Sequence, residues 1–250
     1  MPTKESYISP STAAQLHAVW KTLLDDASEP YRRAGRFAYY FARGKLSADP
    51  VFRAILKHGL LQRSSRILDL GCGQALLCAW LRAAARCCES GQWPTGWPSA
   101  TPAPQIRGVE LKAREVARAR CALGEDCSVT QGDIRSASFG SADAVVILDV
   151  LHYIDADGQR DVLQRVRSAL PAGGLLLFRV GDAAAGLRFR ITSWVDKFAM
   201  FTHGHGWVTT YCRSVTEWRE LLSECGFESA ATPMSDGTPF ANVLLVARAR

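Results

Sequence analysis

The chain has 250 residues, of which 48% are hydrophobic and 22% are charged. These proportions are ordinary for a globular protein, so they exclude a mostly disordered chain, a collagen-like chain and a small disulfide-stapled protein. A chain of this length buries roughly 70–75% of its unfolded surface, so it needs neither a disulfide nor a metal to hold its core. The net charge of +6 is mild at this size and does not by itself indicate a nucleic-acid-binding protein.

The N-terminal residues and the cysteines favour a protein of the cytoplasm. The chain begins Met-Pro-Thr-Lys-Glu-Ser, without the apolar core of a signal peptide, and no apolar run approaches the ~20 residues that span a bilayer. None of the eight cysteines forms a C-x-x-C pair or shows zinc-like spacing. We therefore expect reduced thiols, a cytoplasmic location, no membrane span and no metal.

The first quarter of the chain shows helical patterns. Apolar residues recur at helical spacing over residues 16–24. An aromatic and basic stretch over residues 31–43 predicts a second helix, and an Asp-Pro start signal opens a third over residues 49–61. These patterns predict an N-terminal helical cap over residues 1–63.

From residue 66 onward, short apolar strands alternate with helical segments, which is typical of a doubly wound α/β fold with a largely parallel sheet. A last helix precedes two segments that can close the sheet as an antiparallel pair. The predicted strands are 66–70, 106–110, 127–131, 142–148, 175–180, 227–232 and 242–247. The predicted helices are 76–81, 114–123, 157–170 and 215–225. The sheet domain is therefore expected over residues 64–250.

Two segments interrupt this alternation. Residues 87–105 contain two Trp-Pro pairs where a short turn would suffice, so we interpret them as a surface loop, with a partner site or a lid as the alternative. Residues 182–213 are rich in arginine, aromatic residues, histidine and glycine, and they are too long for a plain connection. We expect this second insertion to form part of a substrate wall.

Polar side chains follow the predicted strands. Asp69, Glu110, Asp133, Asp149 and Arg179 all lie at strand ends. In doubly wound sheets, ligands bind at the carboxyl ends of the strands, near the point where the strand order reverses. The sequence therefore predicts a ligand site at this edge of the sheet.

The first strand, glycine turn and helix are typical of a nucleotide site. Gly71 and Gly73 allow a sharp turn and a close approach of the backbone to a ligand. Glu110 can accept both hydroxyl groups of a ribose. A dinucleotide is disfavoured because Leu76 replaces the third glycine of G-x-G-x-x-G, and because Asp69 places a negative charge near the turn, where it favours a cationic ligand over a pyrophosphate.

Five motifs, in order over residues 64 to about 181, resemble those of class I S-adenosylmethionine-dependent methyltransferases. Their sequences are Ile67-Leu-Asp-Leu-Gly-Cys-Gly-Gln, Gly108-Val-Glu110-Leu, Gln131-Gly-Asp133-Ile, Asp143-Ala-Val-Val-Ile-Leu-Asp149-Val-Leu-His152-Tyr and Leu170-Pro-Ala-Gly-Gly-Leu. The resemblance implies a seven-stranded sheet with a reversed last strand. It also implies S-adenosylmethionine as cofactor, in-line methyl transfer and S-adenosylhomocysteine as product.

The resemblance also implies which residues hold the cofactor, with Asp133 bonding the adenine amine and Ile134 packing on the ring. The implied set is Asp69, Gly71, Cys72, Gly73, Glu110, Leu111, Asp133, Ile134, Asp149 and, from the cap, Arg43 on the methionine carboxylate. More narrowly, Tyr40-Phe-Ala-Arg-Gly-Lys-Leu and Pro239-Phe-Ala-Asn-Val-Leu-Leu look like segments of bacterial methyltransferases from aryl-polyene, xanthomonadin-like pigment clusters.

Histidines are the candidate bases. His152 follows the fourth strand, and its ordinary pKa near 6.5 suits proton transfer at neutral pH, although a packing role beside the cofactor is the alternative. His203 and His205 are alternates, and no nearby carboxylate or cysteine completes a metal site with them. The candidate acceptor-binding residues are Tyr39, Tyr40, Arg190, Tyr211 and Arg213.

The first choice is a small-molecule acceptor, such as an aromatic compound or an apolar acid, that is methylated on oxygen or carbon. The Asn-Pro-Pro-Tyr signature of amine-methylating enzymes is absent, and there is no strong basic stripe for nucleic acid. Three alternatives stay open: a nucleic-acid or protein methyltransferase that uses the basic cap, an NAD(P)-dependent oxidoreductase, and a non-catalytic cofactor-binding scaffold. The sequence allows a homodimer without specifying one.

Overall fold

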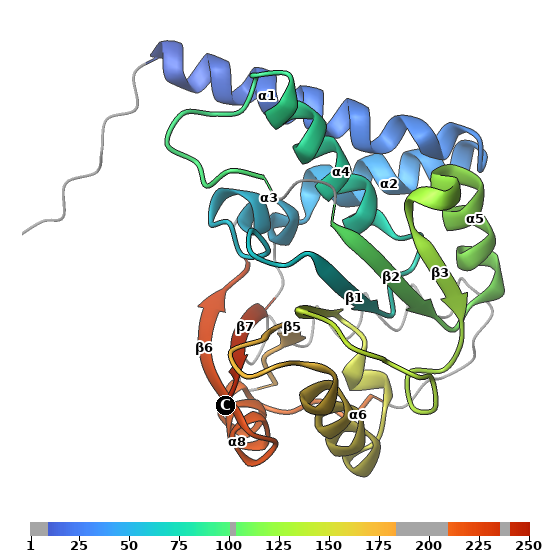
Figure 1. Cartoon of the computed structure of the whole chain (residues 1–250), viewed down its shortest axis with the longest axis vertical. Helices are drawn as coiled ribbons and strands as arrows, with labels where there is room; N and C mark the ends of the chain where they lie inside the picture. The colour runs from blue at the N-terminus through green and yellow to red at the C-terminus, as the bar shows by residue number, and fades with distance from the viewer. Residues whose placement is uncertain (1–9, 101–103, 184–209, 236–240) are drawn as a thin grey trace, which may run out of the picture.

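The computed structural model describes residues 10–100, 104–183, 210–235 and 241–250. Their centre is a seven-stranded sheet of order β3-β2-β1-β4-β5-β7-β6 (Figure 1). β7 runs antiparallel to both β5 and β6, and the other neighbouring strands are parallel. The strands are β1 Arg66–Leu70, β2 Gln105–Glu110, β3 Ser128–Gln131, β4 Ala144–Leu148, β5 Leu175–Gly181, β6 Phe227–Pro233 and β7 Asn242–Ala249. The expected Rossmann-like sheet with a reversed last strand is confirmed.

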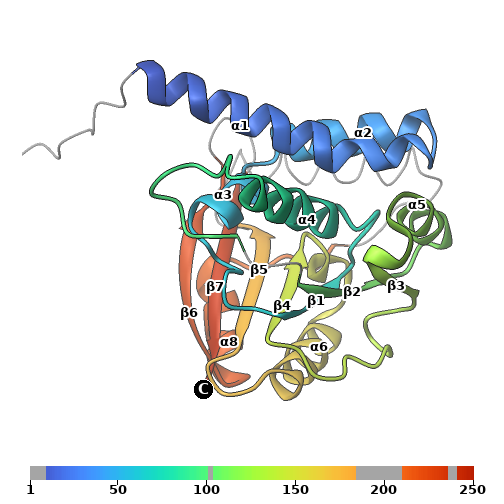
Figure 2. The same cartoon turned by 45° about the horizontal axis from the view of Figure 1, so that its top comes forward.

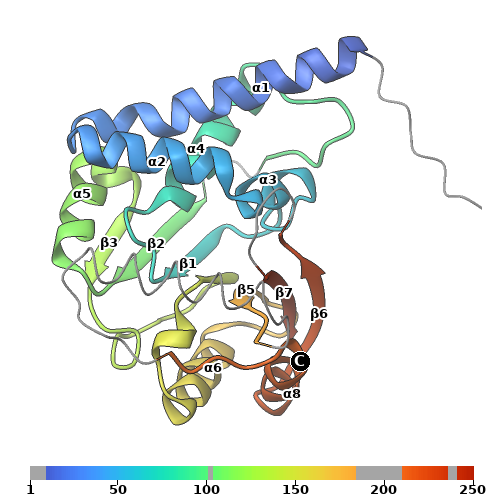
Figure 3. The same ribbon diagram turned by 180° about the vertical axis from the view of Figure 1, so that it is seen from behind.

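The helices form a layer on each face of the sheet. α6 and α8 cover one face, while α3 and α4 cover the other, with α1 and α2 outside α4 (Figure 2). Viewed from behind, α1 and α2 again lie side by side (Figure 3). The α-helices are α1 Pro10–Ser28, α2 Arg36–Ala48, α3 Pro50–Lys57, α4 Leu76–Glu89, α5 Ala113–Leu123, α6 Ala156–Ala169 and α8 Val215–Glu224. The 3₁₀ turns are η1 Glu29–Arg32, η2 Gly124–Asp126 and η3 Leu151–Tyr153.

The second predicted helix was wrong in its bounds. The expected helix over residues 31–43 begins instead as the 3₁₀ turn η1, and α2 starts only after Gly35. Gly35 has a φ of 103°, a conformation that favours glycine, so the chain turns there before the helix begins. α2 then continues to Ala48. The buried side chains of α2 are Ala38, Ala42 and Leu46.

Successive side chains of a strand point to opposite faces of the sheet, and this determines which polar groups face the cap. In β1, Ile67 packs on the side of α3 and α4, whereas Leu68 packs on the side of α6 and α8. Two residues after Ile67, Asp69 therefore lies on the cap side. In β5, Leu177 packs on the cap side, so Arg179 faces that side too. Both charged groups are thus directed toward the N-terminal helices.

A cluster of packed tryptophan rings joins the cap to the sheet domain. The indole of Trp20 in α1 stacks on Trp80 of α4, with ring centroids 6.1 Å apart and planes at 2°. Trp97 lies 4.8 Å from Trp20, and Trp93 lies 5.7 Å from Trp97. Because aromatic pairs bury large apolar areas, this cluster ties the Trp/Pro insertion and α1 to one helix of the sheet domain.

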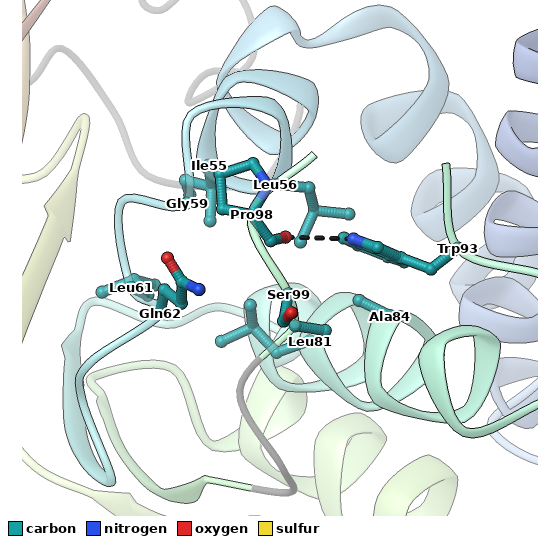
Figure 4. A pocket seen from close by; sticks show the side chains of 11 residues that line it. Ile55, Leu56, Gly59, Leu61, Gln62, Leu81, Ala84, Trp93, Pro98 and Ser99 are labelled. Atoms are coloured by element: carbon teal, nitrogen blue, oxygen red, sulfur yellow. Dashed lines mark hydrogen bonds between the residues drawn. The ribbon is translucent and has the colours of Figure 1, made fainter. Parts of the chain in front are cut away.

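The described part of the 87–105 insertion packs against the helices. Its first residues, 87–89, extend α4, and farther along the Trp93 indole N–H donates to the Pro98 carbonyl at 3.0 Å (Figure 4). A side-chain carbon at Gly59 would lie 2.6 Å from Pro98, so this contact requires glycine. The space enclosed there is about 20 Å³. That volume holds about one water molecule, so this pocket is too small for a ligand.

Among the helices that the structure describes, none combines the length and the apolar character needed to cross a bilayer.

Candidate functional site

A pocket of about 200 Å³ opens where β1, β4 and β5 end, between the sheet and helices α2 and α3. We call it the strand-end pocket. Its walls combine apolar side chains of the cap with charged and amide groups of the sheet domain. It is lined by Phe41, Lys45, Phe52, Asp69, Gly71, Cys72, Gly73, Gln74, Leu76, Leu77, Leu148, Asp149 and Arg179. The sequence placed a ligand at this edge of the sheet, and a pocket lies there.

The glycine turn forms one wall of this pocket. Gly71 has a φ of 73°, and its N–H donates to the Val109 carbonyl at 2.8 Å. A side-chain carbon at Gly71 would lie 2.3 Å from Val150, so only glycine fits. Gly73 also has a positive φ, of 56°, but nothing lies within 4 Å of the same position there. The first glycine thus allows close packing, and the second leaves open space at the pocket.

Cys72, between these glycines, is 9% exposed and packs over β2. A side-chain carbon at Gly108 would lie 2.5 Å from the Cys72 sulfur, so the strand needs glycine where the turn crosses it. Burial raises the pKa of the Cys72 thiol well above its ordinary value. The thiol is therefore uncharged at neutral pH and acts as part of the packed wall.

Glu110 connects the end of β2 to the glycine turn. One carboxylate oxygen accepts from the Gly73 N–H at 2.9 Å, and the other accepts from the Lys112 N–H at 2.8 Å. The side chain is 7% exposed, so these two bonds fix its position. A carboxylate has about four acceptor sites, so each oxygen keeps capacity for another donor. This arrangement suits a ligand with two adjacent hydroxyl groups.

Asp69 is a buried acid beside a second acid. It is 6% exposed and lines the strand-end pocket. Burial, and to a smaller extent the charge of Glu110, raises the pKa of Asp69 to about 7. A cation bound in the pocket would stabilise the ionised form, so this carboxyl is suited to bind a ligand ammonium or sulfonium group.

The raised pKa of Asp69 predicts how stability changes with pH. In the unfolded chain this carboxyl ionises near pH 4, whereas in the ligand-free fold it keeps its proton to about pH 7. The unfolded state therefore binds fewer protons between these values, and the contribution of Asp69 to stability falls as pH rises. Asp69→Asn removes this dependence. Relative to the wild type, its free energy of unfolding should gain about 2–3 kcal/mol between pH 5 and pH 8.

Urea unfolding of both proteins without ligand, at pH 5, 6, 7 and 8, measures this difference. The other carboxyl groups titrate in both proteins, so the difference isolates Asp69. A difference that stays constant across this range would contradict the raised pKa.

A buried ion-pair network lies along one side of the strand-end pocket. The Arg179 guanidinium, 1% exposed, donates through Nε to Asp149 at 2.9 Å and also pairs with Asp49. Lys45 lies 2.9 Å from Asp49 and 3.9 Å from Asp149. Burial alone would raise the pKa of Asp49, but the charges of Arg179 and Lys45 lower it to about 2. The network therefore stays ionised at neutral pH and joins the cap to β4 and β5.

Asp149 reaches this network from an unusual backbone conformation. Its φ is 59°, in the left-handed region that non-glycine residues rarely adopt. Burial raises the pKa of Asp149, but the charges of Arg179 and Lys45, together with the hydrogen bond from Arg179, outweigh burial and lower it. The ion pair with Arg179 thus holds the carboxylate of a residue whose backbone is strained, at the wall of the pocket.

The residues expected around the adenine lie beyond the strand-end pocket. Asp133 follows β3 and is held by Arg135, whose Nε lies 2.9 Å from one of its oxygens. Ile134 is 7% exposed and belongs to the core on the side of α6. Leu111, directly after Glu110, is 61% exposed. Of the three, Leu111 offers the most apolar surface to a ligand.

The structure does not bring the predicted cap residues into the pocket. Arg43 pairs with Asp25 of α1 at 2.6 Å, and also donates to Ser28. Tyr39 packs on the core below the Arg32 guanidinium, which lies 4.0 Å from its ring centre, and Tyr40 is 62% exposed. The residues of α2 that line the pocket are instead Phe41 and Lys45.

His152 lies in η3, three residues after Asp149, and does not line the strand-end pocket. Its ring centre is 4.1 Å from that of Tyr153. Burial lowers the pKa of His152, while the Asp149 charge opposes that shift. The imidazole is therefore neutral at pH 7, which is the form a general base needs.

Gln159 holds the turn of His152 against the last residues of the second insertion. Its amide donates to the carbonyls of Ile154 at 2.9 Å and Tyr211 at 2.8 Å, and accepts from Arg213 at 2.7 Å. The Tyr211 N–H donates to the His152 carbonyl at 2.8 Å, and the Tyr211 side chain is 44% exposed. Tyr211 and Arg213 are thus joined to the turn of His152, and they do not line the strand-end pocket.

Other predicted residues lie outside the described part of the chain. They are Arg190, His203 and His205, together with most of the expected substrate wall over residues 182–213. Seven of the residues that line the pocket were not among the predicted site residues: Phe41, Lys45, Phe52, Gln74, Leu76, Leu77 and Leu148. Gln74 is the first residue after the glycine turn, and a polar side chain before the run of apolar residues in α4 was the available signal.

The residues present fit S-adenosylmethionine. The ionisable Asp69 suits a cationic amino acid, the paired oxygens of Glu110 suit a ribose, and Gly73 leaves open space between them. The buried amide of Gln74 lines the same pocket, and within the described part of the chain neither of its polar atoms has a hydrogen-bond partner. A ligand that carries both donors and acceptors would satisfy it.

Comparison with known proteins identifies the family of this chain. The family described as Methyltransferase domain matches residues 37–231. Carboxy-S-adenosyl-L-methionine synthase of Chromohalobacter salexigens is 35% identical over 77 residues, which are 29% of this chain and 28% of the synthase. That match thus spans little more than a quarter of the relative.

Solved methyltransferases share the fold. Human N-acetylserotonin methyltransferase, in complex with S-adenosylmethionine, aligns with a TM-score of 0.58 and 17% identity over 100% of this chain and 60% of its own. Magnesium protoporphyrin IX methyltransferase of Synechocystis, with bound S-adenosylhomocysteine, aligns with a TM-score of 0.55 and 16% identity over 98% of this chain and 97% of its own. The family match covers most of the chain, so this protein belongs to the methyltransferase-domain family.

Proposed function

We propose that the strand-end pocket binds the amino-acid end of S-adenosylmethionine, and that the chain methylates a small-molecule acceptor on oxygen or carbon. This proposal rests on one observation: three suitable residues lie together at the ends of β1 and β2. Asp69 lies buried in the pocket, Gly73 leaves open space beside it, and Glu110 is fixed by its bond to the Gly73 N–H. Together they suit a cationic amino acid joined to a ribose.

Each of the proposed residues has a separate role. Glu110 accepts the ribose hydroxyls, and Asp69 balances the positive charge of the ligand. Leu111 supplies apolar surface for the adenine. Asp133 accepts from the adenine amine with one carboxylate oxygen that also faces Arg135. Arg43 is no longer proposed for the methionine carboxylate, because Asp25 already holds its guanidinium.

The bound cofactor supplies a methyl group on a positively charged sulfur. The chain's own contribution is to orient both reactants and to exclude water from the space between them. Phe41 and Phe52 of the cap line the pocket and form an apolar wall against solvent. His152 is proposed to take the proton from an acceptor that is a weak nucleophile, such as a phenol.

An exposed aromatic surface on α2 supports a flat, apolar acceptor. Phe37 and Phe41 stack with ring centroids 5.9 Å apart, and they are 50% and 42% exposed. Phe41 also lines the strand-end pocket, so the aromatic surface is continuous with it. Pockets for small organic molecules are usually lined in this way. Tyr40, 62% exposed on the same helix, extends the aromatic surface.

The nucleic-acid and protein alternatives rely on the basic cap, but three of its cations are already paired. Arg32 pairs with Glu29, Arg43 pairs with Asp25, and Lys45 pairs with Asp49. Nucleic-acid binding depends on cations that are available to neutralise phosphates. The paired cap therefore favours the small-molecule acceptor. An NAD(P) cofactor is disfavoured because its pyrophosphate would meet the carboxyl groups of Asp69 and Glu110.

Calorimetric titration with S-adenosylhomocysteine, S-adenosylmethionine and NADH tests the cofactor site. We expect the first two to bind and NADH not to bind. Glu110→Ala and Asp69→Ala should each weaken S-adenosylhomocysteine binding by about 1–3 kcal/mol, because each removes a charge-linked hydrogen bond. Glu125→Ala, which removes an exposed carboxylate elsewhere, is the matched control and should leave affinity unchanged.

Thermal unfolding of each variant excludes general misfolding as the cause of lost affinity. Unchanged affinity in both Glu110→Ala and Asp69→Ala would refute the site, and binding of NADH alone would support the oxidoreductase.

The acceptor is then identified by incubating the protein with S-adenosylmethionine and a panel of phenols and carboxylic acids, followed by mass spectrometry for a gain of one methyl group. Methylation of oligonucleotides or peptides instead would refute the proposed class of acceptor.

A further inference from the structure

Gln74 is buried with an unsatisfied amide. Its side chain is 1% exposed, and neither the amide oxygen nor the amide nitrogen has a hydrogen-bond partner among the residues that the structure describes. Buried polar side chains almost always have partners, because a buried amide without them loses the hydrogen bonds that water supplies in the unfolded chain. An apolar residue of the same size would be more favourable at this position in the ligand-free fold. The amide therefore calls for a function beyond packing.

The backbone around Gln74 is held in place, so the amide does not reach water by a small local movement. The buried Tyr31 hydroxyl in η1 donates to the Gln74 carbonyl at 2.8 Å. Burial raises the pKa of Tyr31, so the hydroxyl keeps its proton and remains a donor. The next residue, Ala75, has a φ of 58° and directly precedes α4 as its N-cap residue. Contacts from the cap and the start of a helix thus fix this residue from both sides.

The surroundings of Gln74 indicate which ligand would satisfy its amide. Its side chain lines the strand-end pocket together with Asp69 and Asp149, and the open space at Gly73 is one residue away. An amide offers an oxygen that accepts and an NH₂ group that donates twice. An α-amino acid offers an ammonium that donates and a carboxylate that accepts. The amide and a zwitterion are therefore complementary in both directions.

We propose that Gln74 is a positioning residue for the cofactor, whose amide binds the α-amino-acid group of S-adenosylmethionine by accepting from the ammonium and donating to the carboxylate. This proposal rests on the placement of the cofactor in the strand-end pocket. Asp69 supplies the negative charge for the ammonium, and Gln74 supplies the donor that the carboxyl groups nearby cannot. Binding at the amino-acid end would orient the sulfur and its methyl group relative to the acceptor.

The test compares ligands with and without the amino-acid group. S-adenosylhomocysteine has the whole group, decarboxylated S-adenosylhomocysteine keeps only the amine, and 5′-methylthioadenosine has neither. In calorimetry, Gln74→Met, which keeps the length of the side chain and removes the amide, should weaken S-adenosylhomocysteine about 10- to 100-fold. It should weaken the decarboxylated ligand less and 5′-methylthioadenosine by less than about threefold. Gln62→Met, at an exposed glutamine, is the matched control and should bind all three ligands as the wild type does.

Thermal unfolding without ligand gives a second measurement. Gln74→Met should raise Tm by about 2–8 °C, because it removes a buried amide that has no partner. If Gln74→Met does not fold, Gln74→Glu serves as the second variant. Its carboxyl group would repel the ligand carboxylate, so it should weaken S-adenosylhomocysteine more than 5′-methylthioadenosine.

The outcomes separate this proposal from the cofactor site itself. Equal weakening of all three ligands, or a lowered Tm with unchanged affinities, would overturn the role of Gln74 and leave a structural role. If Glu110→Ala weakens both S-adenosylhomocysteine and 5′-methylthioadenosine while Gln74→Met weakens neither, only the role of Gln74 is wrong. If Glu110→Ala also changes nothing, the placement of the cofactor is wrong.

Discussion

Replacement of His152 by alanine is expected to lower turnover by about 10²- to 10⁴-fold, the range for loss of a general base, and to leave the affinity for S-adenosylhomocysteine unchanged. The reason is the position and protonation of the imidazole. η3 carries it just after Asp149, which lines the strand-end pocket, and burial lowers its pKa so that it is neutral at pH 7. The measurement is single-turnover methylation of a phenol found in the acceptor screen, with calorimetry of S-adenosylhomocysteine alongside.

His58→Ala is the matched control, because His58 is an exposed histidine at the end of α3. A base also predicts a pH profile: the wild-type rate should fall as pH drops below the lowered pKa of His152, and this limb should disappear in His152→Ala. Imidazole added to the variant should restore part of the rate. Unchanged turnover, or a loss of turnover matched by a loss of cofactor affinity, would remove His152 as the base.

The sheet and the glycine turn were predictable from sequence because their signals are local. Apolar runs of strand length alternate with helical spacing, and Asp69, Gly71 and Gly73 lie within five consecutive residues. Their positions follow from a strand end and a tight turn, whatever the rest of the chain does. Glu110 was predictable for the same reason, since it ends the neighbouring strand.

The cap side of the site was harder to predict because it depends on helix phase. Residues two apart on a helix differ by about 200° around its axis, so they point to nearly opposite sides. In α2, Lys45 lines the pocket, whereas Arg43 pairs with Asp25 of α1. An aromatic and basic stretch indicates a helix, but not which of its basic residues faces the sheet.

Contacts between distant segments account for the rest. Tyr31 bonds the carbonyl of Gln74, 43 residues away, and Arg179 pairs with Asp49, 130 residues away. Arg179 was recognised as a polar strand end, but its carboxylate partner in the cap depends on how α3 packs on the sheet. A charged residue in an apolar strand predicts that a buried partner exists, without naming it.

Arg179→Met is expected to lower the free energy of unfolding by about 3–5 kcal/mol, the largest stability change that we predict for this protein. Methionine can fill much of the same space, but Asp49 and Asp149 would lose the buried guanidinium that holds them ionised. Lys45 lies 2.9 Å and 3.9 Å from the two carboxylates and can balance only one charge. Because Asp49 also caps α3 by accepting from the Val51 N–H at 3.1 Å, loss of the network should loosen the cap as well.

Urea unfolding at pH 7 measures the change, with Arg32→Met as the matched control. Arg32 pairs with Glu29 at 2.8 Å, but both side chains are more than half exposed, so its loss should change stability by less than about 1 kcal/mol. Adding Asp49→Asn and Asp149→Asn to Arg179→Met should recover part of the lost stability, because the unpaired charges are then removed. A loss below about 1 kcal/mol in Arg179→Met, or no recovery in the triple variant, would show that the network contributes little to holding the cap on the sheet.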